Sequence, residues 1–347
     1  MRQALPLLVT ALIVSVLAGA RLQLSARSQE GGAIHGRVSH RDTGAGVAGV
    51  AITVVSAAGP RLSAKTDADG VYTLAGLPTG TYFVQTNAPL GTFLIDEAYR
   101  GKRCWLETCD LKATDPVTVR APAATTGIDF VLSPGATIAG TVTSGANGSP
   151  VAGASVIVRR KGATPGERTA PTKADAQGRY RSPALVTGEY TVEAWPPGDS
   201  SNLIRVMFGG RVCTYYGCPW SEAESVRVTE PGQTSSIDLV LPLGGSISGI
   251  VTASASGQPL GHVLVTAEGE SFSARTVSTA DGKFTITALV TGMYTVHARP
   301  AWEGTMGAPR DLWPLLEGLA EQTYATRVRV TAPQSVASIN FALTTRR

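Results

Sequence analysis

Aromatic residues are scarce in this 347-residue chain, at 6% of the composition, and histidine and cysteine occur only four times each. With so few aromatic side chains, each hydrophobic core must be small and built mainly from Val, Ile, Leu and Tyr. The histidines are His35, His40, His262 and His297. None has a second His or a Glu at metal-ligand spacing, and neither a His-Glu-x-x-His motif nor a Gly-x-Ser-x-Gly turn occurs. The sequence therefore predicts no enzyme activity, no catalytic residues, no metal and no cofactor.

Charge of one sign is not concentrated anywhere in the chain. The net charge is +4, and no block of Lys or Arg occurs. Proteins that bind nucleic acids usually carry a basic stripe. The even distribution of charge therefore argues against a nucleic-acid partner and is typical of a solvated, mildly basic surface.

Long apolar runs are absent except at the N-terminus, where residues 5–18 follow the charged Arg2. This run is too short for a comfortable membrane span, and Ala18-Gly19-Ala20 fits a small-x-small cleavage site. We expect residues 1–20 to be a signal peptide, with an uncleaved anchor as the alternative, and residues 21–32 to be a flexible leader. No other transmembrane segment is predicted. The protein is then secreted, periplasmic or at the cell surface.

What the chain does contain is glycine and proline, 39 and 21 residues, and a pattern that repeats. Asp69-Gly70-Val71-Tyr72 recurs as Gln177-Gly178-Arg179-Tyr180 and as Asp281-Gly282-Lys283-Phe284, in steps of 108 and 104 residues. A Thr-Gly turn follows ten residues later in each copy, at Gly80, Gly188 and Gly292. The first glycine supplies the positive φ of a tight turn. We read each copy as a hairpin of two strands, in which Tyr and Val two residues apart share one face.

Further strands flank each copy. A strand with alternating apolar residues around a glycine opens each repeat, at residues 33–38, 137–142 and 246–251, and a short strand closes it, at residues 128–132, 237–241 and 339–343. Many short strands with regular turns are typical of a β-sandwich. The sequence predicts an all-β chain of three tandem sandwiches at residues 33–134, 135–244 and 245–347, joined by junctions short enough to make a rod with limited bending.

The ordered motifs Gly-x-Val, then a Gly-x-x-Val strand, then Asp-Gly-x-Tyr/Phe, then Gly-x-Tyr-x-Val resemble the carboxypeptidase regulatory-like domain. The resemblance extends in three copies from residue 33 to about residue 343. It implies a transthyretin-like, Greek-key β-sandwich and a non-catalytic accessory of secreted and surface proteins. Some relatives of similar fold bind carbohydrate. The family pattern contains no catalytic residue, so none is carried over.

The four cysteines form two pairs with equal spacing, Cys104 with Cys109 and Cys213 with Cys218, at the same place in the first two repeats. Four cysteines allow three pairings. A disulfide within each pair is the simplest, because a duplicated module should carry its own cross-link. Closing so small a loop contributes only about 2 kcal/mol in the chain-entropy model. The alternative is a zinc site, which would need ligands brought together from separate modules.

Exposed aromatic residues are the one indication of binding. Trp195 lies five residues after Tyr190, so alternation places it on the outward face of its strand. The candidate ligand-contacting residues are Trp195, Tyr215, Tyr216, Trp220 and Trp302. Flat rings on loops can stack on sugars or contact another protein. Alternatively, they pack down and cap the edge of the sandwich.

The third repeat has no cysteines and instead carries an insertion at residues 309–321, in which residues 311–319 have apolar residues at helical spacing. Loops on a rigid scaffold often carry function. We therefore predict a secreted, non-enzymatic structural or adhesive protein that presents its cysteine loops and this insertion to a surface protein. The alternative is a polysaccharide-binding protein that uses the aromatic residues. The sequence specifies no oligomeric state.

Overall fold

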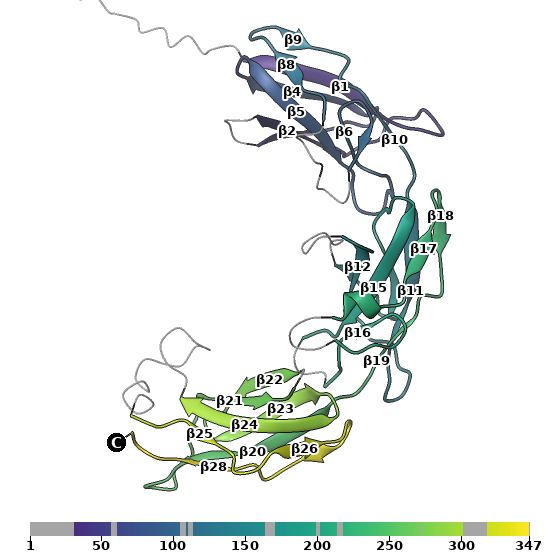
Figure 1. The fold of residues 1–347 in the computed structure, drawn as a ribbon. Helices are drawn as coiled ribbons and strands as arrows, with labels where there is room; N and C mark the ends of the chain where they lie inside the picture. The colour runs from purple at the N-terminus through teal and green to yellow at the C-terminus, as the bar shows by residue number, and fades with distance from the viewer. Residues whose placement is uncertain are drawn as a thin grey trace, which may run out of the picture.

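The computed structural model describes residues 31–56, 61–104, 109, 114–163, 171–198, 202–213, 218–270, 272–300 and 318–346. These residues form three β-sandwich modules that follow one another along an arc (Figure 1). These residues also include a turn of 3-10 helix, η2 (Trp220–Glu222). No helix among these residues is long and apolar enough to cross a bilayer. The predicted signal peptide lies outside the described residues.

The strands of the first module are β1 (Gly32–His40), β2 (Ala51–Ser56), β3 (Leu62–Lys65), β4 (Val71–Leu77), β5 (Gly80–Asn87), β6 (Glu97–Ala98), β7 (Lys102–Arg103), β8 (Val117–Val119), β9 (Ala124–Thr125) and β10 (Phe130–Leu132). Those of the second are β11 (Ala136–Ser144), β12 (Ser155–Arg160), β13 (Thr172–Lys173), β14 (Arg179–Arg181), β15 (Gly188–Trp195), β16 (Val206–Met207), β17 (Val226–Val228), β18 (Gly232–Thr234) and β19 (Leu239–Leu241). Those of the third are β20 (Gly245–Ala253), β21 (Val263–Glu268), β22 (Ser273–Val277), β23 (Lys283–Leu289), β24 (Gly292–Pro300), β25 (Gln322–Thr323), β26 (Val328–Val330), β27 (Ser335–Val336) and β28 (Phe341–Leu343).

Each module is built from two sheets that face each other. In the first module, one sheet has the strand order β10-β1-β4, and β9 also pairs with β1. The other sheet has the strand order β3-β2-β5-β6-β7, and β8 also pairs with β5. The opening strand β1 pairs in parallel with the closing strand β10. The second and third modules repeat this plan, with β11 parallel to β19 and β20 parallel to β28.

The two strands of the repeated motif do not form the predicted hairpin. In the first module β4 pairs with β1, whereas β5 pairs with β2 in the opposite sheet. The chain crosses between the sheets at Pro78 and Thr79, and the Tyr82 hydroxyl donates to the Pro78 carbonyl at 2.8 Å. Equivalent bonds join Tyr190 to Val186 and Tyr294 to Val290. The tyrosine thus holds a corner between two sheets rather than a turn within one sheet.

The first turn of the motif is confirmed. Gly70, Gly178 and Gly282 have φ values of 78°, 71° and 76°, a region that residues with a side chain rarely adopt. In the second module Asp175 Oδ1 accepts bonds from the amides of Gln177 and Arg179, both at 2.9 Å. This local acceptor fixes the turn before β14 begins.

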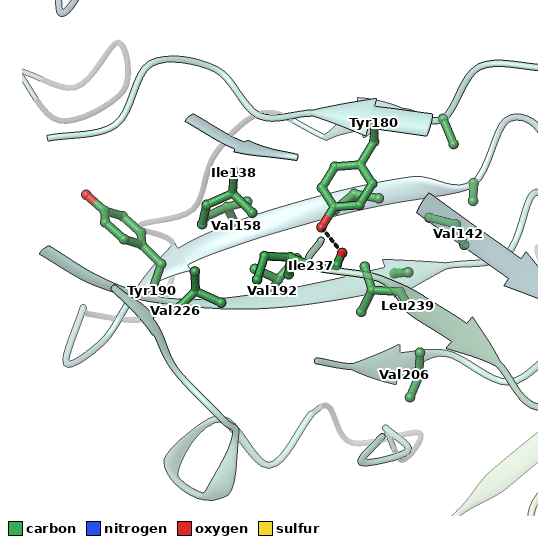
Figure 2. Packing of buried hydrophobic residues seen from close by; sticks show 14 of the residues in the cluster. Ile138, Val142, Val158, Tyr180, Tyr190, Val192, Val206, Val226, Ile237 and Leu239 are labelled. Carbon is green, nitrogen blue, oxygen red and sulfur yellow. Dashed lines mark hydrogen bonds between the residues drawn. The ribbon is translucent and has the colours of Figure 1, made fainter. Parts of the chain in front are cut away.

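The core of each module lies between its two sheets, and Figure 2 shows that of the second module. Along β15, Tyr190, Val192 and Ala194 point inward and are fully buried. Val158 of the neighbouring strand β12 lies beside them in the same sheet, and Ile138 of β11 packs against them from the opposite sheet (Figure 2). At about 25 cal/mol per Å² of apolar surface removed from water, this burial is the main stabilising contribution to the sandwich.

A glycine in each opening strand lets the closing segment approach closely. A Cβ on Gly140 would overlap the carbonyl oxygen of Ile237. The same carbonyl accepts a 2.6 Å hydrogen bond from the buried Tyr180 hydroxyl (Figure 2). Gly36, Tyr72 and Ile128 form the same arrangement in the first module. This explains why the motif combines a strand glycine with a tyrosine after the first turn.

The first and second modules are joined by an ion pair that crosses their junction. Arg103 Nη1 lies 2.7 Å from Glu230 Oε2, while Glu230 Oε1 accepts a bond from the Thr187 amide at 2.6 Å. Glu97 lies buried nearby. Burial raises the pKa of Glu97, and the positive charges of Arg41 and Arg103 partly offset that effect. One glutamate thus caps a turn of its own module and holds an arginine of the preceding one.

The two junctions use one backbone position in different ways. Phe93 and Asn202 both have positive φ, 53° and 48°. The backbone carbonyl of each accepts a hydrogen bond from the amide of the glycine at which the next module begins. The Arg181 guanidinium lies 3.7 Å from the centroid of the Phe93 ring. At the second junction Asn202 Oδ1 instead accepts a 2.7 Å bond from the Ala288 amide. Each module therefore contacts the next through this residue.

Candidate binding surface on the second module

The two predicted aromatic site residues that the structure describes, Trp195 and Trp220, lie on the outer face of one sheet of the second module, together with the second cysteine pair. Because Tyr190, Val192 and Ala194 fill the core, alternation along β15 turns Glu193 and Trp195 to the opposite face. The second cysteine pair, which lies against Glu193, and η2, whose Trp220 ring is covered by Arg159, contribute to the same face. We call this the outer surface of module two.

Two Trp–Arg pairs lie on this surface. The Arg205 guanidinium carbon lies 4.6 Å from the centroid of the Trp195 ring, and that of Arg159 lies 4.4 Å from the centroid of the Trp220 ring. Such cation–π contacts contribute about 0.5–1 kcal/mol each at exposed sites. Both indoles are partly exposed. One face of each ring is therefore occupied by a guanidinium that presents N–H donors beside an apolar plane.

Not every donor on this surface is satisfied. Trp195 Nε1 and Arg159 Nε are buried and have no hydrogen-bond partner. Buried donors without partners are rare in folded proteins. Arg211 Nη1 pairs with Glu222 Oε2 at 2.7 Å, which ties η2 to the segment that follows β16. Arg159 and Arg205 make this surface cationic beside its two indole rings.

The disulfides confirm the predicted pairing within each cysteine pair. Cys104 is bonded to Cys109, and Cys213 to Cys218. In the second module the disulfide lies against Glu193, whose Oε2 is 2.6 Å from Cys218 Sγ and 4.0 Å from Cys213 Sγ. Glu193 and Cys213 are 2% and 1% exposed. Sequence reasoning missed this buried carboxyl group.

Glu193, Cys213 and Cys218 are also the described residues whose potential metal-ligand atoms come together, all within 4.8 Å. Zinc binds cysteine as the thiolate, and a disulfide has none to offer. In the form seen here, this cluster is therefore a cross-link against a carboxyl group, not a metal centre. The ligands also come from one module rather than from separate ones.

Several predicted residues lie outside the described part of the chain. Tyr215, Tyr216 and Trp302 are among them, as is almost all of the 309–321 insertion with its predicted helical turns. The structure thus brings Trp195 and Trp220 to one surface of the second module. For the other three aromatic residues, the predicted contact with a ligand stays a prediction.

The position of Glu193 differs between the three modules. Gln85 pairs across the sheet with Ala98 just as Glu193 pairs with Met207, and both are buried. In the third module the same place on the strand is taken by His297, whose Nδ1 lies 2.9 Å from Thr323 Oγ1. The repeat register of the sequence contains this signal, because it aligns these three residues in one column.

The fold and this surface together define a tandem β-sandwich protein with one disulfide in each of its first two modules. The family model of the carboxypeptidase regulatory-like domain matches residues 33–91, 137–242 and 246–304. These ranges cover more than half of the chain, which therefore belongs to the carboxypeptidase regulatory-like domain family. The resemblance given by the sequence motifs is confirmed in all three repeats. No curated protein matches the chain.

Similar solved structures include one bacterial protein and two pilins. The Bacillus anthracis TIE protein is 14% identical with a TM-score of 0.26, and the match covers 91% of this chain and 51% of that one, so this chain spans about half its length. A streptococcal ancillary pilin is 9% identical with a TM-score of 0.32, covering 91% and 99%. BcpA, the major pilin subunit of Bacillus cereus, is 11% identical with a TM-score of 0.23, covering 91% and 100%.

Proposed function

We propose that this chain is a secreted or surface-exposed, non-enzymatic protein in which rigid modules hold the outer surface of module two for contact with a partner. Disulfides persist in oxidising compartments, which supports export. The observation that carries the proposal is the pair of Trp–Arg contacts beside a disulfide on a sheet whose other face is fully packed. A binding site on a rigid sheet loses little conformational entropy when its partner binds.

The chemistry of the surface favours a protein partner. Trp and Arg are enriched among residues that contribute most to protein interfaces. A guanidinium also covers one face of each indole, so that face cannot stack on a neutral sugar. Carbohydrate binding is the alternative, supported by the partial exposure of Trp195 and Trp220 on one surface. It requires the uncovered ring faces to be accessible.

The test is binding of the full chain to a panel of extracellular proteins and of neutral and acidic polysaccharides. Trp220→Ala and Arg159→Ala should each weaken binding to the partner about tenfold or more, because central Trp and Arg residues of an interface typically cost about 2 kcal/mol or more on truncation. Leu90→Ala is the matched control, because Leu90 is 79% exposed on the first module. Binding that survives both substitutions would contradict the proposed surface. Binding confined to polysaccharides would establish the alternative.

A further inference from the structure

Three acidic residues of the outer surface of module two are already engaged within the module. Glu189 is paired with Lys161 at 3.2 Å, and Glu222 with Arg211 at 2.7 Å. Glu193 is 2% exposed and lies against the disulfide. These carboxyl groups therefore do not balance the charge of the arginines that lie over the indole rings.

Arg159 is the cation of this surface that has no counter-ion. Its guanidinium carbon lies 4.4 Å from the centroid of the Trp220 ring, and no residue in the described part of the chain forms an ion pair with it. Its Nε is buried, although the residue as a whole is partly exposed. A partner can therefore reach the guanidinium only through its two terminal nitrogens.

A guanidinium held over a ring suits a carboxylate. Two parallel N–H groups on one edge of a guanidinium match the two oxygens of a carboxylate, and such pairs are frequently bidentate. The Trp220 ring limits the motion of Arg159, so less side-chain entropy is lost when a carboxylate binds. A neutral hydroxyl group offers neither the charge nor the two acceptors.

A second cation lies within reach of the same partner. The Arg205 guanidinium carbon lies 4.6 Å from the centroid of the Trp195 ring. Thr191 pairs with Arg159 across the sheet, and Trp195 lies four residues farther along β15. At about 3.3 Å per residue the two positions are about 13 Å apart along the strands, a distance that an extended segment of about five residues spans. One segment can therefore place a carboxylate at each arginine.

We propose that the outer surface of module two binds an extended acidic segment of a protein, in which two Asp or Glu residues four positions apart pair with Arg159 and Arg205. This inference rests on the function proposed above and names the chemistry of its partner. Complementary charge of this kind raises association rates and discriminates between partners. A protein segment is favoured over an acidic polysaccharide, because its apolar side chains can also pack on the partly exposed indole rings.

The probe is immobilised poly-L-glutamate, whose like charges keep it extended at neutral pH, and the full chain is expected to bind it. Arg159→Gln should weaken this binding about tenfold, because hydrogen bonds to charged groups are the stronger ones. Arg159→Lys keeps a charge over the ring and should weaken it less. Raising the salt from about 0.1 M to about 1 M shortens the Debye length from about 10 Å to about 3 Å and should also weaken binding.

Arg329→Gln is the matched control and should leave binding unchanged. Arg329 is exposed on β26, the strand of the third module that corresponds to β17. Thermal unfolding of each variant, expected to match that of the unaltered chain, shows that the fold is retained. Equal binding of Arg159→Gln and the unaltered chain to poly-L-glutamate, or no binding by either, would overturn the proposal.

The measurements also separate the acidic partner from the function proposed above. If a protein of the panel depends on Trp220 while the chain does not bind poly-L-glutamate, the outer surface of module two is the interface and the acidic partner is wrong. If neither depends on this surface, both proposals fail. Tighter binding to polygalacturonate than to poly-L-glutamate would overturn the protein segment and assign the surface to an acidic polysaccharide.

Discussion

At the scale of single residues, the most informative position is the buried tyrosine after the first turn. Tyr72 and Tyr180 donate to the carbonyls of Ile128 and Ile237 at 2.6 Å. Burial is the main cause that raises the pKa of both phenols, so their hydroxyls stay protonated as donors. The third module has Phe284 instead, and its core closes without this bond. The hydrogen bond is therefore a stabilising addition to the fold rather than a requirement.

Tyr180→Phe should destabilise the second module by about 1–3 kcal/mol, because it leaves the buried carbonyl of Ile237 without this partner. The measurement is hydrogen exchange of the amides of β11, β14 and β19, together with the thermal unfolding of the full chain. Exchange in the first and third modules should not change. Protection of the second module equal to that of the unaltered chain would contradict the structural role given to the hydroxyl.

At the scale of elements, the turn before β23 depends on an ionised carboxylate. Asp281 lies 2.7 Å from Lys283 Nζ and accepts a 2.6 Å bond from Thr279 Oγ1. The bond from Lys283, and then that from Thr279, lowers the pKa of Asp281 from its ordinary 3.8 to about 2. Since the pKa in the folded state lies below that of the unfolded chain, the ionised form stabilises the turn.

This stabilisation should be fully present above about pH 4 and should be lost as the pH falls through about 2. An NMR titration of Asp281 measures the midpoint directly, and exchange of the Gly282 amide, which donates to the Thr279 carbonyl at 2.8 Å, reports on the turn. In Lys283→Ala the midpoint should move up toward the ordinary value. A midpoint near 3.8 in the unaltered chain would show that the contacts do not act on this carboxyl group.

The elements also show how far sequence reasoning extends. Strand positions, the turn glycines and the pairing of cysteines rest on local patterns, and the structure confirms them. The predicted hairpin was wrong because a two-residue connection does not determine whether two strands pair with each other or with distant strands. Here β4 pairs with β1, and β5 pairs with β2. This pairing depends on burying the inner faces of both sheets in one core.

The candidate surface was predictable only in part. Alternation placed Trp195 on the outer face, but Arg159 and Arg205 could not be assigned to the indole rings because those contacts depend on how loops fold back. Glu193 was missed because a glutamate at an outward strand position normally faces water. Comparing the aligned position across the three repeats, where Gln85 and His297 stand, would have marked it as unusual.

At the scale of the whole molecule, the two junctions differ in charge. The pair between Arg103 and Glu230 crosses the first junction. The corresponding residues of the second junction are Val212, which precedes Cys213 as Arg103 precedes Cys104, and Ala332, which follows β26 as Glu230 follows β17. The angle between the first two modules is therefore held by an interaction that the second pair lacks.

Arg103→Ala should broaden the range of angles between the first and second modules, because the partly exposed ion pair contributes about 1 kcal/mol. Small-angle scattering of the full chain should show an increased radius of gyration or a broader distance distribution, and 1 M salt should have a similar but smaller effect on the unaltered chain. Val212→Ala is the matched control at the second junction and should change nothing. Scattering curves of Arg103→Ala that superimpose on those of the unaltered chain would contradict this role.

The parallel pairing of the first and last strand in each module has a mechanical consequence. When the chain is pulled from both ends, the force enters a module through β1 and leaves through β10, which are hydrogen-bonded neighbours in parallel. The load therefore acts along the strands and stretches their hydrogen bonds together rather than opening them one after another. The same loading applies to β11 with β19 and to β20 with β28. Three such units in series would bear tension along the chain without unravelling from either end.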